Sequence, residues 1–356
     1  MIKTNFRIVS PLLMTGILFI TACHKSSDEN NVDVTQLRKD ILSDAAITVA
    51  GASYVDLSAK ATQLLSAVQA LNTTTNDANL AACRDLWKST RETWELSEAW
   101  LIGPVVADDI DPRIDTWPVD FNDLNGVLAS SATLDDAYMD GLETSLKGFH
   151  PIEYLLWGKD GSKAASSLTD REKEYLLALT QNLKKLCGEV EVSWSGSYTH
   201  LMRNAGASGN TEFPTTRSAY ETLVDAMAGI CDEVAEGKMK DPFDQQDPTQ
   251  EESPFAKNSI TDFTNNIKGI LAMYQGRFIN DGKGIEDLVR NYNLSLDNEI
   301  KTKHAAAIGA LQAITLPFGE AIISQQTQVA NAMSRISELA EVLETKLKPF
   351  VQQYGQ

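Results

Sequence analysis

Apolar residues recur at helical spacing along most of this chain. The clearest stripe lies near the C-terminus, where apolar residues step by three or four positions along one helix face: Val329, Met333, Ile336, Ala340, Leu343, Leu347 and Phe350. Such a stripe is typical of a helix that packs one face into a core. Alternating apolar and polar runs, which would indicate β-strands, are not evident. The pattern therefore predicts an all-α protein.

Turn and capping residues predict where the helices begin and end. The first helix contains Gly51, near which we expect a bend, and the second stops at Gly103-Pro104. Thr169, with Glu172 three positions later, is typical of a helix start. Short helices are expected before residue 158. The principal helices are expected over 34–71, 77–103, 168–203, 213–237, 256–276, 284–312 and 317–352.

The helices are expected to form two domains. Residues 204–210 read Asn-Ala-Gly-Ala-Ser-Gly-Asn, which is rich in turn formers. This segment would separate an N-terminal bundle, 34–205, from a C-terminal bundle, 211–356. The doubled architecture predicts two packed domains, each similar to a four-helix bundle. Ligand sites in such proteins tend to lie between facing helices or at the domain interface.

The N-terminus predicts export and lipid attachment. A basic start is followed by an apolar run over 11–20, which is too short to span a membrane. Residues 20–23, Ile-Thr-Ala-Cys, resemble a bacterial lipobox. We therefore expect a signal peptide over 1–22, a lipidated Cys23 and a flexible tether over 23–33. The expected location is the cell envelope, either periplasmic or at the outer membrane, with the membrane contacted only through the lipid.

The charge balance narrows the class of partner. The chain has 49 acidic and 31 basic residues and a formal net charge of −18. Removal of the signal peptide would also remove Lys3 and Arg7 and no acidic residue. Such a surface argues against nucleic acid and anionic lipid as partners and is compatible with collecting cations.

The remaining cysteines are expected to be core residues. Cys83, Cys187 and Cys231 each lie in an apolar helical pattern, and none forms a C-x-x-C pair. Buried free thiols are the simpler interpretation. One disulfide stays open, because the expected compartment is oxidising.

A short motif in the middle of the chain offers candidate chemistry. It reads Gly148-Phe149-His150-Pro151-Ile152-Glu153, and the spacing puts His150 and Glu153 on one side of a helix start. An imidazole beside a carboxylate can bind a metal ion. The alternative is structural: Pro151 suits the first turn of a helix, where the Glu153 carboxylate could cap free backbone N–H groups.

Acidic residues upstream of the motif are further candidates. Glu98 precedes an apolar stretch, so we expect its carboxylate to be partly buried and to need a partner. The loop over 108–120 carries five aspartates. It does not match an EF-hand, because Arg113 and Ile114 occupy positions that require a ligand and a glycine. The chain also lacks the H-E-x-x-H and G-x-S-x-G signatures of hydrolases.

Taken together, these elements resemble the imelysin family, which includes insulin-cleaving metalloproteinase-like proteins and iron-regulated bacterial envelope proteins. The family pattern G-x-H-x-x-E is matched from Gly148 to Glu153, and the segment continues Tyr-Leu-Leu-Trp-Gly to residue 158. Arg91, Glu98 and the turn over 117–120 also fit the resemblance. Downstream, residues 253–267 resemble the family's second-domain segment.

The resemblance implies a two-bundle fold with a metal site near the domain interface. His150 and Glu153 are the expected ligands, with Glu98, Asp115 and Asp120 as candidates to complete the site. Arg91 and Gly148 would support these ligands without binding the metal. Iron is the favoured ion, with zinc and calcium as alternatives.

Three functions follow from this interpretation. The first is an envelope lipoprotein that binds a metal ion or metal chelate for uptake, with an unidentified transport partner. The second is a metallopeptidase, which the missing zinc-peptidase signature disfavours. The third is a binding module for a non-metal ligand or a protein, in which His150 and Glu153 only shape the helix start.

Overall fold

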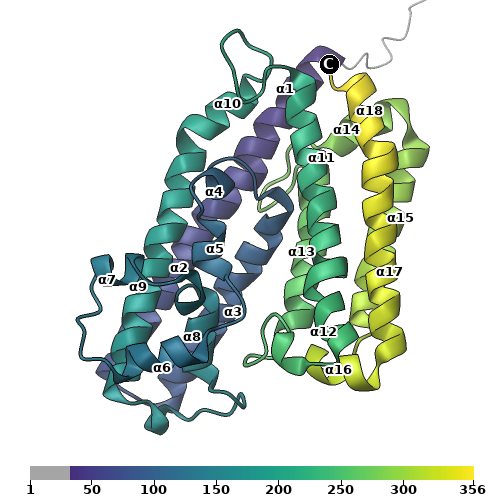
Figure 1. The fold of residues 1–356 in the computed structure, drawn as a ribbon. Helices are drawn as coiled ribbons and strands as arrows, with labels where there is room; N and C mark the ends of the chain where they lie inside the picture. The colour runs from purple at the N-terminus through teal and green to yellow at the C-terminus, as the bar shows by residue number, and fades with distance from the viewer. Residues whose placement is uncertain (1–32) are drawn as a thin grey trace, which may run out of the picture. The chain divides into compact units, whose positions relative to one another are not determined.

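Long helices run side by side through the part of the chain that the structure describes, residues 33–356 (Figure 1). In this computed structural model those residues contain no β-strand, only one isolated bridge between Arg277 and Asp281. The predicted all-α class is therefore confirmed. The predicted signal segment 1–22 and Cys23 lie outside the described residues, as does the tether apart from its last residue.

The N-terminal helices gather around α2, which packs against α3 and α9 (Figure 1). Their bounds are α1 (Val34–Asp44), α2 (Ala52–Thr73), α3 (Asp77–Ser97), α4 (Pro104–Ala107), α5 (Asp111–Asp115), α6 (Phe121–Ala129), α7 (Asp136–Asp140), α8 (Phe149–Trp157), α9 (Asp170–Ser193) and α10 (Thr199–Arg203). A wide π-helical turn over Ala45–Gly51 joins α1 to α2. The backbone at Gly51 and Ala52 stays helical, so the bend that the sequence predicts near Gly51 remains a prediction.

The C-terminal helices form a second bundle in which α17 packs against α11 and α15 (Figure 1). Their bounds are α11 (Thr216–Asp232), α12 (Lys240–Gln245), α13 (Ser259–Gln275), α14 (Ile285–Tyr292), α15 (Leu294–Gln312), α16 (Phe318–Ser324), α17 (Gln326–Val342) and α18 (Lys348–Tyr354). The predicted apolar stripe of the last helix is confirmed, because Val329, Ile336 and Leu343 are fully buried. Residues 34–356 form one compact unit, and the domain boundary at 204–210 stays a prediction.

Short helical turns complete the chain between these helices. The π-helical turns span Ala45–Gly51, Trp194–Tyr198, Glu233–Lys238 and Leu343–Leu347, and the 3₁₀ turns span Glu98–Trp100, Thr144–Leu146, Ala165–Ser167 and Pro248–Gln250. None of the described helices is both long enough and apolar enough to cross a membrane. Cys83, Cys187 and Cys231 are buried and free, as their apolar surroundings predict.

Two predicted helices are broken at a polar residue whose side chain binds backbone N–H groups. The helix expected over 284–312 divides at Asn293, whose side chain accepts a hydrogen bond from the Leu296 N–H at 3.1 Å. The helix expected over 317–352 divides at Gln325, whose side chain accepts from the Thr315 N–H at 3.0 Å. Both side chains satisfy backbone groups that would otherwise lie free at a chain turn.

The two bundles meet where α13 packs on α3. Gly269 of α13 allows this approach, because a Cβ atom at that position would lie 2.1 Å from the Leu96 carbonyl oxygen of α3. The crossing brings the end of α3, with Glu95 and Glu98, against Asn266 on the preceding turn of α13. The position of the acidic side chains thus depends on this helix contact.

This contact predicts that Gly269→Ala destabilises the protein by at least about 2 kcal/mol, since the clash is with backbone rather than a movable side chain. Gly188→Ala on α9 is the matched control, because a Cβ there meets nothing within 4 Å. The control should be neutral or stabilising by up to about 1 kcal/mol. Urea unfolding of both variants measures the difference, and equal stabilities would contradict a tight α3–α13 contact.

Candidate metal centre

A buried arginine organises the polar centre of the molecule. Arg91 lies in the middle of α3 and its side chain has no exposed surface. Its guanidinium nitrogens lie 2.6 Å from Glu95, 2.6 Å from Glu252 and 3.4 Å from Asp262, and they also pair with Asp115. A buried guanidinium requires such partners, because its desolvation is costly. The arginine therefore draws carboxylates from α3, α5, α13 and the segment before α13 to one point.

His150 and Glu153 project from the first turns of α8 toward the same point. His150 is fully buried, and its Nε2 atom lies 3.1 Å from Asp115 Oδ1 and 3.8 Å from Glu252 Oε1. Nε2 nevertheless makes no correctly directed hydrogen bond, because the nearby Asp115 oxygen lies off the direction of the ring N–H. The Trp117 ring covers the imidazole at a centroid distance of 5.0 Å.

Glu153 ties α8 to the segment before α13. Its Oε1 accepts the backbone N–H of Ala256 at 2.7 Å, and its Oε2 lies 3.5 Å from His150 Nδ1. Helix α8 starts after Gly148, which has no side chain, and the Glu153 carboxylate binds these two groups rather than backbone N–H groups of the first turn. The capping role considered for Glu153 is therefore wrong. The carboxylate instead holds one ring nitrogen of His150 and leaves Nε2 facing the other carboxylates.

Gly148 is required by the close approach of two backbones. Its φ of +84° lies in the left-handed region, and a Cβ atom there would lie 2.0 Å from the Ile114 carbonyl oxygen. Only glycine accommodates both conditions. The contact places the start of α8 beside the end of α5, and so brings His150 next to Asp115.

A second acidic group lies at the end of α3. The Asn266 side-chain amide donates to Glu95 at 2.7 Å and to Glu98 at 2.8 Å. The Lys238 ammonium lies 2.8 Å from Glu98, 3.6 Å from Glu252 and 3.8 Å from Glu95. The partner that the sequence predicts for a buried Glu98 is thus a lysine and an asparagine from the C-terminal half.

Two sets of side chains have the geometry to hold a cation. In the described residues these sets are Asp115, His150 and Glu252, and Glu95, Glu98 and Asp115, and within each set the ligand atoms lie within 4.8 Å of one another. Asp115 belongs to both. A mixture of imidazole nitrogen and carboxylate oxygen suits divalent transition metals.

Several carboxyl groups of the cluster have shifted pKa values, because many acidic side chains lie close together in a buried place. Burial raises the pKa of Glu95 to about 8 against the opposing effect of Arg91, and burial together with Glu95 holds the pKa of Glu98 well above its ordinary value. Burial also acts on Asp115, but Arg91 and His150 outweigh it and hold the pKa of Asp115 well below its ordinary value.

His150 also carries a proton at neutral pH. Burial and the charge of Arg91 lower the pKa of His150, but the adjacent carboxylates of Asp115 and Glu153 outweigh them and raise it to about 9. In the metal-free protein, protons on His150 and Glu95 therefore offset part of the excess negative charge.

An acidic cavity of about 370 Å³ opens in front of these side chains. Glu98, Asp115 and Glu252 line it together with Lys238. Its remaining lining residues include the acidic Asp111, Glu233 and Asp241, with Trp117, Pro118, Gly237, Pro242 and Gln250. The cavity gives a small cation a route from solvent to the buried carboxylates.

The structure brings most of the predicted site residues together. Glu98, Asp115, His150, Glu153 and Arg91 belong to this buried cluster, with Gly148 at its edge. Asp120 does not: it is exposed and caps α6 by accepting the Asn122 and Asp123 N–H groups at 2.9 and 3.0 Å. Its nearness to Asp115 in sequence did not place it at the site, because helix α6 required a cap.

Four charged residues of the cluster were not predicted as site residues. They are Glu95, Lys238, Glu252 and Asp262. Glu95 was visible in the stripe of α3 beside Arg91 and Glu98, and Asp262 lies in the segment that carries the family resemblance. Lys238 and Glu252 lie in a polar region with no distinguishing local signal.

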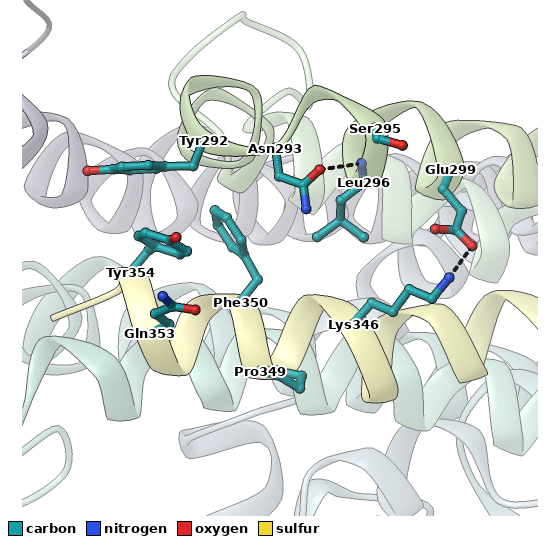
Figure 2. A pocket seen from close by; sticks show the side chains of 10 residues that line it. All are labelled: Tyr292, Asn293, Ser295, Leu296, Glu299, Lys346, Pro349, Phe350, Gln353 and Tyr354. Atoms are coloured by element: carbon teal, nitrogen blue, oxygen red, sulfur yellow. Dashed lines mark hydrogen bonds and ion pairs between the residues drawn. The ribbon is translucent and has the colours of Figure 1, made fainter.

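A second pocket, of about 390 Å³, lies between α15 and α18 (Figure 2). Figure 2 shows stacked rings on one side, where Tyr292 and Tyr354 have centroids 4.3 Å apart. On the other side the Lys346 ammonium pairs with Glu299 at 2.5 Å. None of the predicted site residues lines it, so the Arg91 cluster remains the candidate site.

The cluster predicts that Arg91→Met lowers the free energy of unfolding by about 3–5 kcal/mol at neutral pH, because it leaves buried carboxylates unpaired. Arg91 lowers the pKa of Asp115 in the folded protein. The Asp115 carboxylate therefore stabilises the fold above its ordinary pKa of 3.8, and this stabilisation is lost as the pH falls toward the lowered pKa. The difference between the variant and the wild type should therefore shrink below about pH 4. Urea unfolding at several pH values measures it.

Arg290→Met is the matched control, because the Arg290 side chain is 54% exposed and pairs only at 3.7 Å with Glu286. Its effect should stay within about 0.5 kcal/mol. A similar small effect for Arg91→Met would contradict the organising role of the buried arginine.

The chain is similar to known proteins over most of its length. Iron-regulated protein A of Synechococcus elongatus is 29% identical over 310 residues, which cover 84% of this chain and 83% of that protein. A solved structure from Parabacteroides distasonis, assigned as an iron-regulated protein A precursor, has a TM-score of 0.79 and 23% identity, covering 90% of this chain and 95% of that one.

An imelysin-like protein from Psychrobacter arcticum shares the fold with a TM-score of 0.73 and 13% identity, over 89% of this chain and 96% of that one. The family model for imelysin matches residues 50–345. The family resemblance inferred from the motif of residues 148–153 is thereby confirmed: the chain belongs to the imelysin family.

Proposed function

We propose that this protein binds a metal ion, with iron favoured, at the cluster around His150 and works in metal uptake at the cell envelope, anchored through Cys23. The observation that carries the proposal is the His150 Nε2 atom. It is fully buried, has no hydrogen-bond partner, and faces carboxylate oxygens of Asp115 and Glu252 at 3.1 and 3.8 Å. A polar atom buried in this way has a cost unless a ligand satisfies it.

The side chains divide into ligands and supports. His150, Asp115 and Glu252 would bind the ion, and their atoms already lie close enough to share one. Glu153 contacts the other ring nitrogen and accepts the Ala256 N–H, so it would orient the imidazole. Arg91 pairs with Asp115 and Glu252 and would hold both carboxylates in place.

The donor set and the relatives support iron. One imidazole with carboxylates suits iron, whereas calcium prefers six to eight oxygens. The solved and curated relatives include proteins described as iron-regulated protein A. Zinc remains the closest alternative, since imidazole and carboxylate also bind it.

The proposed ligand roles predict that metal binding depends on Asp115 and His150 and not on Asp120. Asp115→Asn and His150→Ala should each weaken metal binding by roughly 100-fold or more, beyond the 10–100-fold typical of a supporting residue. Asp120→Asn and His200→Ala are the matched controls, since both residues are exposed and outside the cluster. Isothermal titration with Fe²⁺ under anaerobic conditions, Zn²⁺ and Ca²⁺ measures the affinities.

Near-unit stoichiometry, with selective loss in the Asp115 and His150 variants, would support the proposal. Undiminished binding in both would overturn it. The metallopeptidase alternative predicts instead that the wild type cleaves an unfolded protein, that a chelator stops cleavage, and that Glu153→Ala abolishes it. The non-metal alternative predicts no metal binding by the wild type.

Metal binding should also release protons. His150, with a pKa of about 9, is protonated at neutral pH, and a metal can bind Nε2 only after that proton leaves. Apparent affinity should therefore rise with pH from about 6 to 8, by up to about tenfold per pH unit for each proton released. Titration in two buffers with different ionisation enthalpies measures the number of protons, and a pH-independent affinity would contradict a His150 ligand.

A further inference from the structure

The candidate metal centre contains two buried cations with different surroundings. Arg91 has no exposed surface and pairs with carboxylates on every side. Lys238 lies on the wall of the acidic cavity, and its side chain is 11% exposed. Arg91 is thus a permanent counter-ion of the cluster, whereas Lys238 borders the cavity and is partly exposed.

The Lys238 ammonium lies where a second ligand set would hold a cation. It is 2.8 Å from Glu98 and 3.8 Å from Glu95, two members of the set completed by Asp115, and 3.6 Å from Glu252 of the His150 set. One monovalent ammonium therefore touches acids of both sets. A divalent ion at this place would supply twice the charge and bind the oxygens directly.

The chain around Lys238 permits the ammonium to leave. Lysine has a flexible stem and a single point charge, unlike the fixed fork of an arginine. It ends the π-helical turn over Glu233–Lys238, and Gly237 before it borders open space. Glu233 lies 3.8 Å from the ammonium with a side chain that is 56% exposed, so a displaced Lys238 has a carboxylate to pair with on the solvent side.

We propose that Lys238 is a built-in cation that occupies the entrance of the metal centre and is displaced when a hydrated divalent cation enters through the acidic cavity. The inference rests on the proposed function. It adds that the bound ion is a hydrated divalent cation and that the Lys238 ammonium competes with this ion for the carboxylates. The acidic cluster does not carry it alone: the unpartnered, fully buried His150 Nε2 independently indicates that a ligand belongs there.

The first test compares affinities for Mn²⁺ and anaerobic Fe²⁺. Lys238→Met keeps the length of the stem and removes the competing charge, so it should bind either ion at least tenfold more tightly than the wild type. Lys238→Arg restores a cation that pairs more firmly with carboxylates and should bind severalfold more weakly. Lys240→Met is the matched control, because Lys240 is 43% exposed and pairs with Asp244 outside the cavity lining. It should match the wild type.

The outcomes separate the two proposals. Unchanged or weaker binding by Lys238→Met, while the wild type binds and His150→Ala does not, would leave the proposed function standing and overturn the displacement of Lys238. A wild type that binds neither ion would overturn both.

The second test uses the wild type alone and decides the matter if Lys238→Met does not fold. Acetic anhydride labels accessible amines, and peptide mass spectrometry compares the labelling of Lys238 with that of Lys240. Saturating Mn²⁺ should raise the labelling of Lys238 severalfold and leave Lys240 unchanged. Labelling of Lys238 that does not rise would show that the ammonium keeps its place, and would overturn the inference.

Discussion

The structure depends on the burial of one guanidinium. Arg91 cannot lie inside α3 without carboxylates around it, and those carboxylates come from segments distant in sequence. Asp115 reaches it from α5, Glu252 from the segment before α13, and Asp262 from α13 itself. The same contacts that satisfy the arginine therefore fix the meeting of the two bundles and create the site. Stability and binding are served by one network.

Two glycines make that network geometrically feasible. Gly148 lets α8 touch the backbone of α5, and Gly269 lets α13 touch the backbone of α3. Each contact lies within a few residues of a polar side chain that belongs to the cluster, His150 in the first case and Asn266, the partner of Glu95, in the second. A Cβ atom would lie 2.0 Å from a carbonyl oxygen at Gly148 and 2.1 Å at Gly269, so the paired backbones would have to move apart. The two backbone contacts thus determine how closely the side chains of the candidate site approach one another.

The features that could be predicted from the sequence are those that depend on residue spacing within one helix. The apolar stripes gave the all-α class, and the motif around His150 and Glu153 gave the centre of the site, because their spacing fixes a shared helix side. Two predicted helices divide at Asn293 and Gln325, because each side chain binds backbone N–H groups at a turn that the apolar periodicity does not show. Lys238 and Glu252 could not be predicted, because only the tertiary contact of distant segments brings them to Arg91.

The balance of charge decides what the centre is suited to hold. Six carboxyl groups meet there against two basic side chains, Arg91 and Lys238: Glu95, Glu98, Asp115, Glu153, Glu252 and Asp262. A purely structural ion pair would match its charges, since excess buried carboxylates destabilise a fold. Here protons make up part of the difference, as the raised pKa values of Glu95 and His150 indicate. A metal ion would supply the same compensation with direct bonds to the oxygens, and the cavity would let it reach them. Selection for stability alone would favour fewer buried carboxylates. The excess of carboxylates over basic side chains therefore argues that the cluster binds a cation.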